Sequence, residues 1–152
     1  MSRLSVLAGA ICAAVAFGSV AYAQQPAAPP GQPAYGPVVT IDQAKKVVAA
    51  ALAEAKKSPY QYAFAVVEPS GSLVYFEKMD GAPYASNEIA LRRARNAATF
   101  KRPTADVAEA DVAAGGLPLL VDGKIIGGIG VSGSPAGPTD LSPAQAGANA
   151  LK

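Results

Sequence analysis

Residues 115–133 read GGLPLLVDGKIIGGIGVSG, and this stretch decides the fold class. Two apolar runs, residues 117–121 and 124–131, stand on either side of Asp122-Gly123. An Asp-Gly pair between apolar runs is a strong signal for a two-residue hairpin turn, because both positions tolerate positive φ. The stretch therefore predicts two antiparallel strands joined by a tight turn.

A second hairpin is predicted upstream. Residues 60–68 and 73–79 are rich in aromatic and β-branched side chains, and residues 69–71, Pro-Ser-Gly, supply the turn between them. Neither hairpin needs a crossover connection, so the strands form an antiparallel sheet. A parallel dinucleotide-binding sheet would need strands that alternate with helices, and the chain lacks that pattern.

Three helices flank these hairpins. The first begins at a Thr40/Gln43 capping box and stops before Pro59, and the second runs over residues 86–100 with a thin alanine face. The third is predicted to be capped by Ser142, with Pro143 at its first position. Residues 104–114 are short and acidic, with room for one helical turn. The order α-β-β-α-β-β-α, with an antiparallel sheet flanked by helices, predicts an α+β fold.

The first 23 residues are typical of a secretory signal peptide. Arg3 precedes an apolar run from Leu4 to Val20, and Ala21-Tyr22-Ala23 supplies small residues at a cleavage site. A retained membrane anchor is the alternative, but the run is short for a span. Residues 24–37 contain five prolines and are predicted to be a linker, so the domain proper covers residues 38–152.

Export of the protein is expected to produce one cleavage after Ala23. The mature chain would then begin at Gln24, because signal peptidase reads the small residues at positions 21 and 23. N-terminal sequencing or the intact mass of the exported protein measures this. A mature protein that retains Met1 would contradict the prediction.

Composition excludes several function classes. The chain has no histidine, and its one cysteine, Cys12, lies in the predicted signal peptide. These facts exclude His-dependent triads, His-ligated zinc or haem, disulfides and Cys nucleophiles from the mature domain. Loss of Arg3 leaves 12 basic residues against the 11 acidic ones, a net charge of +1. This small net charge does not indicate a nucleic acid or an acidic membrane as a partner.

The motifs that suggest chemistry each have a structural alternative. Gly128, Gly130 and Gly133 match G-x-G-x-x-G, but no helix opens directly behind them, so close approach of another backbone is favoured over phosphate binding. Ser132 lacks the spacing of a nucleophile elbow. A basic run from Arg92 to Arg102 is either a solvated helix face or a site for an anion such as a propionate or another carboxylate.

Several segments together resemble the GlcG/HbpS-like family, which is described as haem-binding or haem-degrading. Each segment alone is weak evidence for the family, but the segments in combination are specific to it. The resemblance covers nearly all of residues 40–151. The matching segments are residues 41–44, 65–74, 77–82, 89–90, 93–94, 115–119 and 122–133.

This resemblance implies a profilin-like α+β fold, assembly into dimers or larger rings, and binding of haem or another small ligand in some members. Two departures bear on that implication. The segment between Pro103 and Gly115 is shorter than the family pattern, which puts a pocket wall or an oligomer contact in question. The absence of histidine removes the commonest axial haem ligand and leaves Met79, a tyrosine or a hydroxyl for that role.

We therefore expect a periplasmic or secreted protein that self-associates and binds haem or another small planar or anionic ligand, with no nucleic-acid partner and no membrane partner after signal cleavage. Strand ends and loops hold the candidate residues, where ligands usually lie over a rigid sheet. Met79 is also the candidate iron ligand, although a core role is its structural alternative. The expected ligand-binding residues are Met79, Asp80, Gly81, Arg93, Gly115, Gly116, Ser132 and Gly133.

Two other functions remain open at this stage. An oxidative haem-degrading enzyme would need iron and a reductant, and a ligand-free interaction module would only build an assembly. A binding protein is favoured over an enzyme because the sequence offers no evident nucleophile or general base, and no catalytic residue is assigned.

Overall fold

The computed structural model describes residues 31–107, 113–135 and 137–152. The predicted signal peptide and the first half of the predicted linker lie outside these ranges. No helix within them is long and apolar enough to cross a membrane. The elements are α1 (Ile41–Ala55), β1 (Ala63–Val67), β2 (Leu73–Lys78), α2 (Ala85–Phe100), the 3₁₀ turn η1 (Thr104–Asp106), β3 (Gly116–Val121), β4 (Lys124–Ser132), the 3₁₀ turn η3 (Gly137–Asp140) and α3 (Leu141–Asn149).

This order confirms the predicted α-β-β-α-β-β-α arrangement and the α+β class. The four strands form one antiparallel sheet in the order β2-β1-β4-β3. Both predicted hairpins are present, and the two hairpins are joined through pairing of β1 with β4, in which Ala63 stands opposite Ser132. At the turn between β3 and β4, Asp122 and Gly123 both have positive φ, as the tight turn requires.

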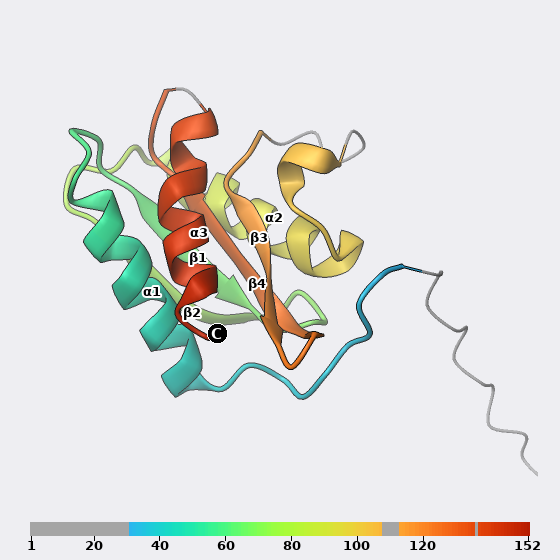
Figure 1. Ribbon diagram of the computed structural model, residues 1–152. Helices are drawn as coiled ribbons and strands as arrows, with labels where there is room; N and C mark the ends of the chain where they lie inside the picture. The colour runs from blue at the N-terminus through green and yellow to red at the C-terminus, as the bar shows by residue number, and fades with distance from the viewer. Residues whose placement is uncertain (1–30, 108–112, 136) are drawn as a thin grey trace, which may run out of the picture.

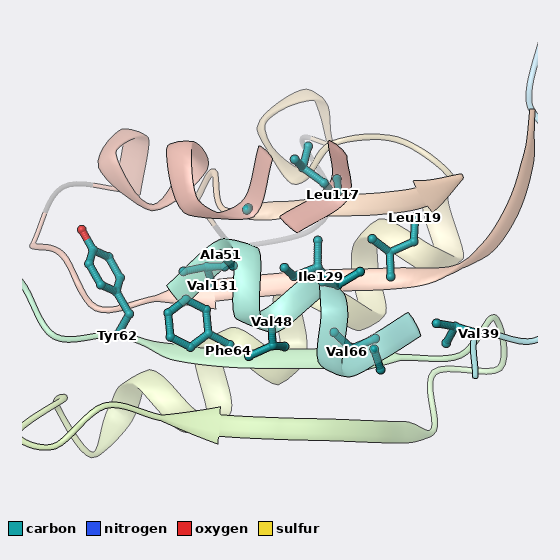
Figure 2. Packing of buried hydrophobic residues seen from close by; sticks show 14 of the residues in the cluster. Val39, Val48, Ala51, Tyr62, Phe64, Val66, Leu117, Leu119, Ile129 and Val131 are labelled. Carbon is teal, nitrogen blue, oxygen red and sulfur yellow. The ribbon is translucent and has the colours of Figure 1, made fainter. Parts of the chain in front are cut away.

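The helices cover the two faces of the sheet unequally. Helices α1 and α3 lie against one face, and α2 lies against the other (Figure 1). The face under α1 and α3 holds the larger core, in which Phe64, Ile129 and Val48 are fully buried (Figure 2). The face under α2 is built from small residues such as Ala63, Ala65 and Ala94. The protein thus has one thick layer and one thin layer of side chains.

The glycines of β4 explain the thin layer. A Cβ atom on Gly128 would collide with the carbonyl oxygen of Ala94, and one on Gly130 would collide with the carbonyl oxygen of Ala90. The backbone of α2 therefore lies directly on the strand. Close backbone approach, the alternative to a phosphate loop, is confirmed for these two positions, since α2 fills the space above them.

Of the two predicted helix N-caps, the one at α1 is confirmed and the one at α3 is wrong. At α1 the side chains of Thr40 and Gln43 form the predicted capping box. Helix α3 was predicted to be capped by Ser142, but it begins at Leu141 with Asp140 at the N-cap. The Ser142 hydroxyl instead donates to Glu54 Oε1 at 3.1 Å. Pro143 is the third helical residue, where its missing N–H costs nothing because the first turn has no intrahelical acceptors.

The end of the predicted linker is attached to the domain. Gly36 N donates to Ile125 O at 2.8 Å, and Ile125 N donates to Ala34 O at 2.9 Å. Tyr35 donates through its hydroxyl to Ala98 O at 3.1 Å, and its ring lies under Lys101 Nζ. The last residues of the proline-rich segment therefore run beside β4 and contact the end of α2.

Candidate functional site

The predicted site residues gather at one end of the sheet. Strands β2 and β4 end there, and β1 and β3 begin there, because Ala63 is paired with both Lys78 and Ser132. Met79 directly follows β2, and Gly116 opens β3 opposite Gly130. Antiparallel register thus brings together segments that are far apart in the sequence. Some of the predicted site residues at this end are buried and others are exposed to solvent.

Arg93 is one of the buried residues of the predicted site. Its side chain is 6% exposed and reaches from α2 to Asp140, with Nη1 at 2.5 Å from Oδ2. The same nitrogen donates to Val131 O at 2.6 Å, and the other Asp140 oxygen accepts from Ser134 N at 2.9 Å. Arg93 therefore does not belong to the solvated face of α2. Its charge has an internal partner, and the pair joins α2 to the start of α3.

The predicted glycines pack against this junction. A Cβ on Gly115 would lie 2.8 Å from Arg93 Nη1, and a Cβ on Gly116 would lie 2.5 Å from Arg93 O. A Cβ on Gly133 would collide with Gln61 O. Protein atoms already fill the space beside all three glycines, so their role in the structure is to let neighbouring segments approach. Ser132 is also buried.

The corner between β2 and α2 is the exposed part of the predicted site. Asp80 and Gly81 are solvent-exposed, and Gly81 has a φ of +81°. Met79 is different: its Sδ accepts a hydrogen bond from Tyr62 N at 3.4 Å, and its side chain packs against the larger core. Tyr84, which sequence reasoning missed, is 89% exposed, and Lys78 Nζ lies 4.9 Å from the centre of its ring.

A cavity of about 310 Å³ opens beside this corner, between the end of α1 and the start of α3. Glu54 and residues 57–60 line one side, Tyr62 lines its inner part, and Thr139, Ser142 and Pro143 line the other. Tyr62 is fully buried and lies at the end of the larger core, with its hydroxyl pointing out of that cluster (Figure 2). The hydroxyls of Tyr62 and Ser58 are 2.9 Å apart.

Charge in this cavity is balanced locally. Lys57 Nζ lies 2.6 Å from Glu54 Oε2. Hydrogen bonds from Lys57 and Ser142 lower the pKa of Glu54 below its ordinary value, so the carboxylate is ionised at neutral pH. Sequence reasoning missed the cavity, since no signal in the sequence ties Glu54 to Ser142 across 88 positions. Among the described residues, no group of three or more Asp, Glu, Cys or His side chains is placed to hold a metal ion.

Comparison with known proteins assigns the family. The model of the family described as "Haem degrading protein HbpS-like" matches residues 39–149. The chain belongs to the HbpS-like family. Among the curated relatives, Protein GlcG of Escherichia coli K12 is 33% identical in an alignment 109 positions long, and the match covers 62% of this chain and 81% of GlcG.

Solved structures agree with this assignment. A double mutant of Streptomyces reticuli HbpS is 30% identical, with a TM-score of 0.71 over 83% of this chain and 95% of that protein. PduOC, which was crystallised in complex with haem, is 22% identical, with a TM-score of 0.69 over 76% of this chain and 96% of that protein. The likeness to PduOC shows a common fold. The HbpS-like α+β architecture predicted for this chain is thus confirmed.

Proposed function

We propose that this HbpS-like protein binds haem, or another small planar or anionic ligand, at the corner formed by residues 78–84. The observation that carries the proposal is the exposed Tyr84, with the half-buried Lys78 against its ring, beside the segment 77–82 that resembles a motif of the family. Tyr84 is 89% exposed, so a ligand can reach both its ring and its phenol oxygen.

The residues at this corner fit haem. Iron needs a ligand other than His or Cys here, and a tyrosine phenol is one of the side chains that ligate haem iron in proteins. A propionate needs a cation, which Lys78 provides. Met79 is less suited than Tyr84 to bind iron, because its sulfur already accepts the Tyr62 N–H and packs against the core. Bound haem would supply the iron chemistry, and the protein would supply the ligand, the cation and the apolar ring.

In this proposal, five of the predicted site residues do not touch the ligand. They are Arg93, Gly115, Gly116, Ser132 and Gly133. Their contacts lie within the protein and hold the ends of β3, β4 and α2 together. We assign them to positioning this end of the sheet, with Asp80 and Gly81 shaping the exposed turn.

A haemin titration tests this assignment. Tyr84→Phe is expected to shift the Soret band and to weaken haemin binding by about tenfold, a loss of about 1.4 kcal/mol. Lys78→Ala is expected to weaken binding by up to about fivefold, since exposed ion pairs contribute about 0.2–1 kcal/mol. Absorption spectra at increasing haemin concentration measure both effects.

The controls are Tyr60→Phe, which changes another exposed tyrosine at the same end, and Met79→Leu, which removes the sulfur but keeps the volume. Neither should alter the Soret band. A shift in Met79→Leu together with an unchanged spectrum in Tyr84→Phe would reassign the iron ligand to Met79. The absence of a saturable haemin spectrum in the wild type would refute haem binding.

Oxidative haem degradation is the second candidate, and the description of the matching family model favours it. Degradation would consume oxygen and a reductant, neither of which the protein contributes. Adding ascorbate in air to the haemin-loaded protein distinguishes the two functions. Steady loss of the Soret band with release of iron supports an enzyme, and a stable band supports a binding protein.

Export to the periplasm or the exterior and self-association are parts of the same proposal. The small-x-small pattern at residues 21–23 supports export, and the near-zero net charge of the mature chain supports association.

A further inference from the structure

The cavity between α1 and α3 is a second site, separate from the exposed corner. None of the residues 78–84 lines it. Its volume of about 310 Å³ is at the lower end of the range of about 300–1,000 Å³ that is typical of small-molecule sites. An apolar protein cavity of roughly 150 Å³ holds one benzene ring. The space therefore suits a molecule of about two fused rings, and it is too small to enclose haem.

The charges of the cavity favour a neutral occupant. Glu54 and Lys57 are the ionisable pair at its edge, and they already neutralise each other at 2.6 Å. A charged ligand would have to break this pair or leave its own charge without a partner. The lining also includes the rings of Pro59, Pro143 and Tyr60, which offer apolar contacts.

The hydroxyls of Ser58 and Tyr62 specify the polar group of the ligand. The Ser58 oxygen accepts a hydrogen bond from Tyr60 N at 3.0 Å, and the two hydroxyls share one hydrogen bond with each other. Each hydroxyl carries one proton, and a single bond between them uses only one of the two. The second proton has no acceptor among the described residues. A hydrogen-bond acceptor on the ligand would satisfy it.

We propose that this cavity binds a small, neutral, aromatic molecule of about two rings that carries an oxygen acceptor such as a ketone or a lactone carbonyl. The rings occupy the apolar part, and the oxygen accepts the spare proton of the Ser58–Tyr62 pair. This inference does not depend on haem binding at the corner.

A matched pair of ligands tests the proposal. 2-Acetylnaphthalene carries a carbonyl acceptor, and 2-ethylnaphthalene has nearly the same shape without it. Isothermal titration of the full domain should show saturable binding of both, with the ketone about two- to twelvefold tighter, as expected for one neutral hydrogen bond of about 0.5–1.5 kcal/mol.

The decisive variant is the double change Ser58→Ala with Tyr62→Phe. Both hydroxyls must go, because either one alone keeps a proton to donate. The double variant should bind the two naphthalenes equally, whereas Tyr75→Phe, which removes a tyrosine hydroxyl bonded to Glu77 on β2, should keep the preference for the ketone. Thermal melting of each variant confirms that it is folded.

Ser142→Phe places a ring at the exposed edge of the cavity and should abolish binding of both ligands. No saturable binding by the folded wild type, or an unchanged preference in the double variant, would overturn the proposal. So would full binding by Ser142→Phe. Haemin spectra report the corner independently, so a protein that binds the ketone but not haemin refutes only the haem site, and the reverse result refutes only this cavity.

Discussion

Arg93→Ala is expected to lower the free energy of unfolding by about 3–5 kcal/mol, the usual loss when one partner of a buried ion pair is removed. The Asp140 carboxylate is completely buried, and without Arg93 it loses its ion-pair partner and keeps the hydrogen bond from Ser134 N. Val131 O loses a donor at the same time. Urea unfolding followed by circular dichroism measures the change.

Two further variants test whether the loss of stability comes from the unpaired buried charge or from the loss of any arginine on α2. Arg95→Ala removes an exposed arginine from the same helix, whose Nε donates to Gly71 O at 3.0 Å, and it should cost about 1 kcal/mol or less. Adding Asp140→Asn to Arg93→Ala removes the unpaired charge, keeps an acceptor for Ser134 N, and should recover part of the loss. Equal losses for Arg93→Ala and Arg95→Ala would contradict a structural role for the pair.

The same variant separates positioning from direct ligand contact. If Arg93 only holds α2 to the start of α3, haemin binding by Arg93→Ala should stay near that of the wild type at temperatures where the variant remains folded. Weaker binding by the folded variant would show that Arg93 reaches a ligand, as the sequence alone suggested.

Gly130→Ala is expected to destabilise the protein by about 3 kcal/mol, at the upper end of the usual cost of overpacking. The new methyl group would collide with the backbone of α2 at Ala90 and Ala94, and backbone cannot rotate away as a flexible side chain can. Helix α2 would have to move off the sheet and would lose its contact with Ala63 and Ala65. Thermal and urea unfolding measure the loss.

Other glycines provide graded controls. Gly128→Ala meets the Ala94 carbonyl oxygen less closely and should cost less than Gly130→Ala. The nearest atom to a Cβ on Gly36 is the Cβ of Lys124 at 2.9 Å, compared with a still closer backbone oxygen for Gly130, so Gly36→Ala should cost less than Gly130→Ala. Equal effects at positions 36 and 130 would show that contact with α2 is not the cause.

Local patterns predicted the elements well because their signals lie within a few residues. The Asp122-Gly123 turn and the Thr40/Gln43 capping box are contacts between near neighbours, and both are present. The alanine face of α2 and the glycines of β4 each indicated close packing on their own. The start of α3 was predicted wrongly because Ser142 is a good capping residue locally, but its hydroxyl contacts Glu54 on α1.

The site was less predictable, since its composition depends on pairings between distant segments. The segment 77–82, which resembles the family, located the exposed corner, but the exposure of Tyr84 depends on how α2 leaves that corner. Arg93 was predicted to face a ligand because its sequence neighbours are basic. The fold instead places it opposite Asp140, 47 positions away.

The sequence by itself determined the α+β class, the two hairpins, and the absence of histidine from the chain and of cysteine from residues 24–152. Composition, turns and short-range periodicity carry these properties. Only the tertiary structure decided that β1 pairs with β4, that α2 lies on the thin face, and that Arg93 is paired internally. It also decided that Thr139, Ser142 and Pro143 lie across a cavity from Ser58 and Tyr62. These features arise from burial of apolar surface between segments far apart in the chain, and local sequence patterns do not encode which segments meet.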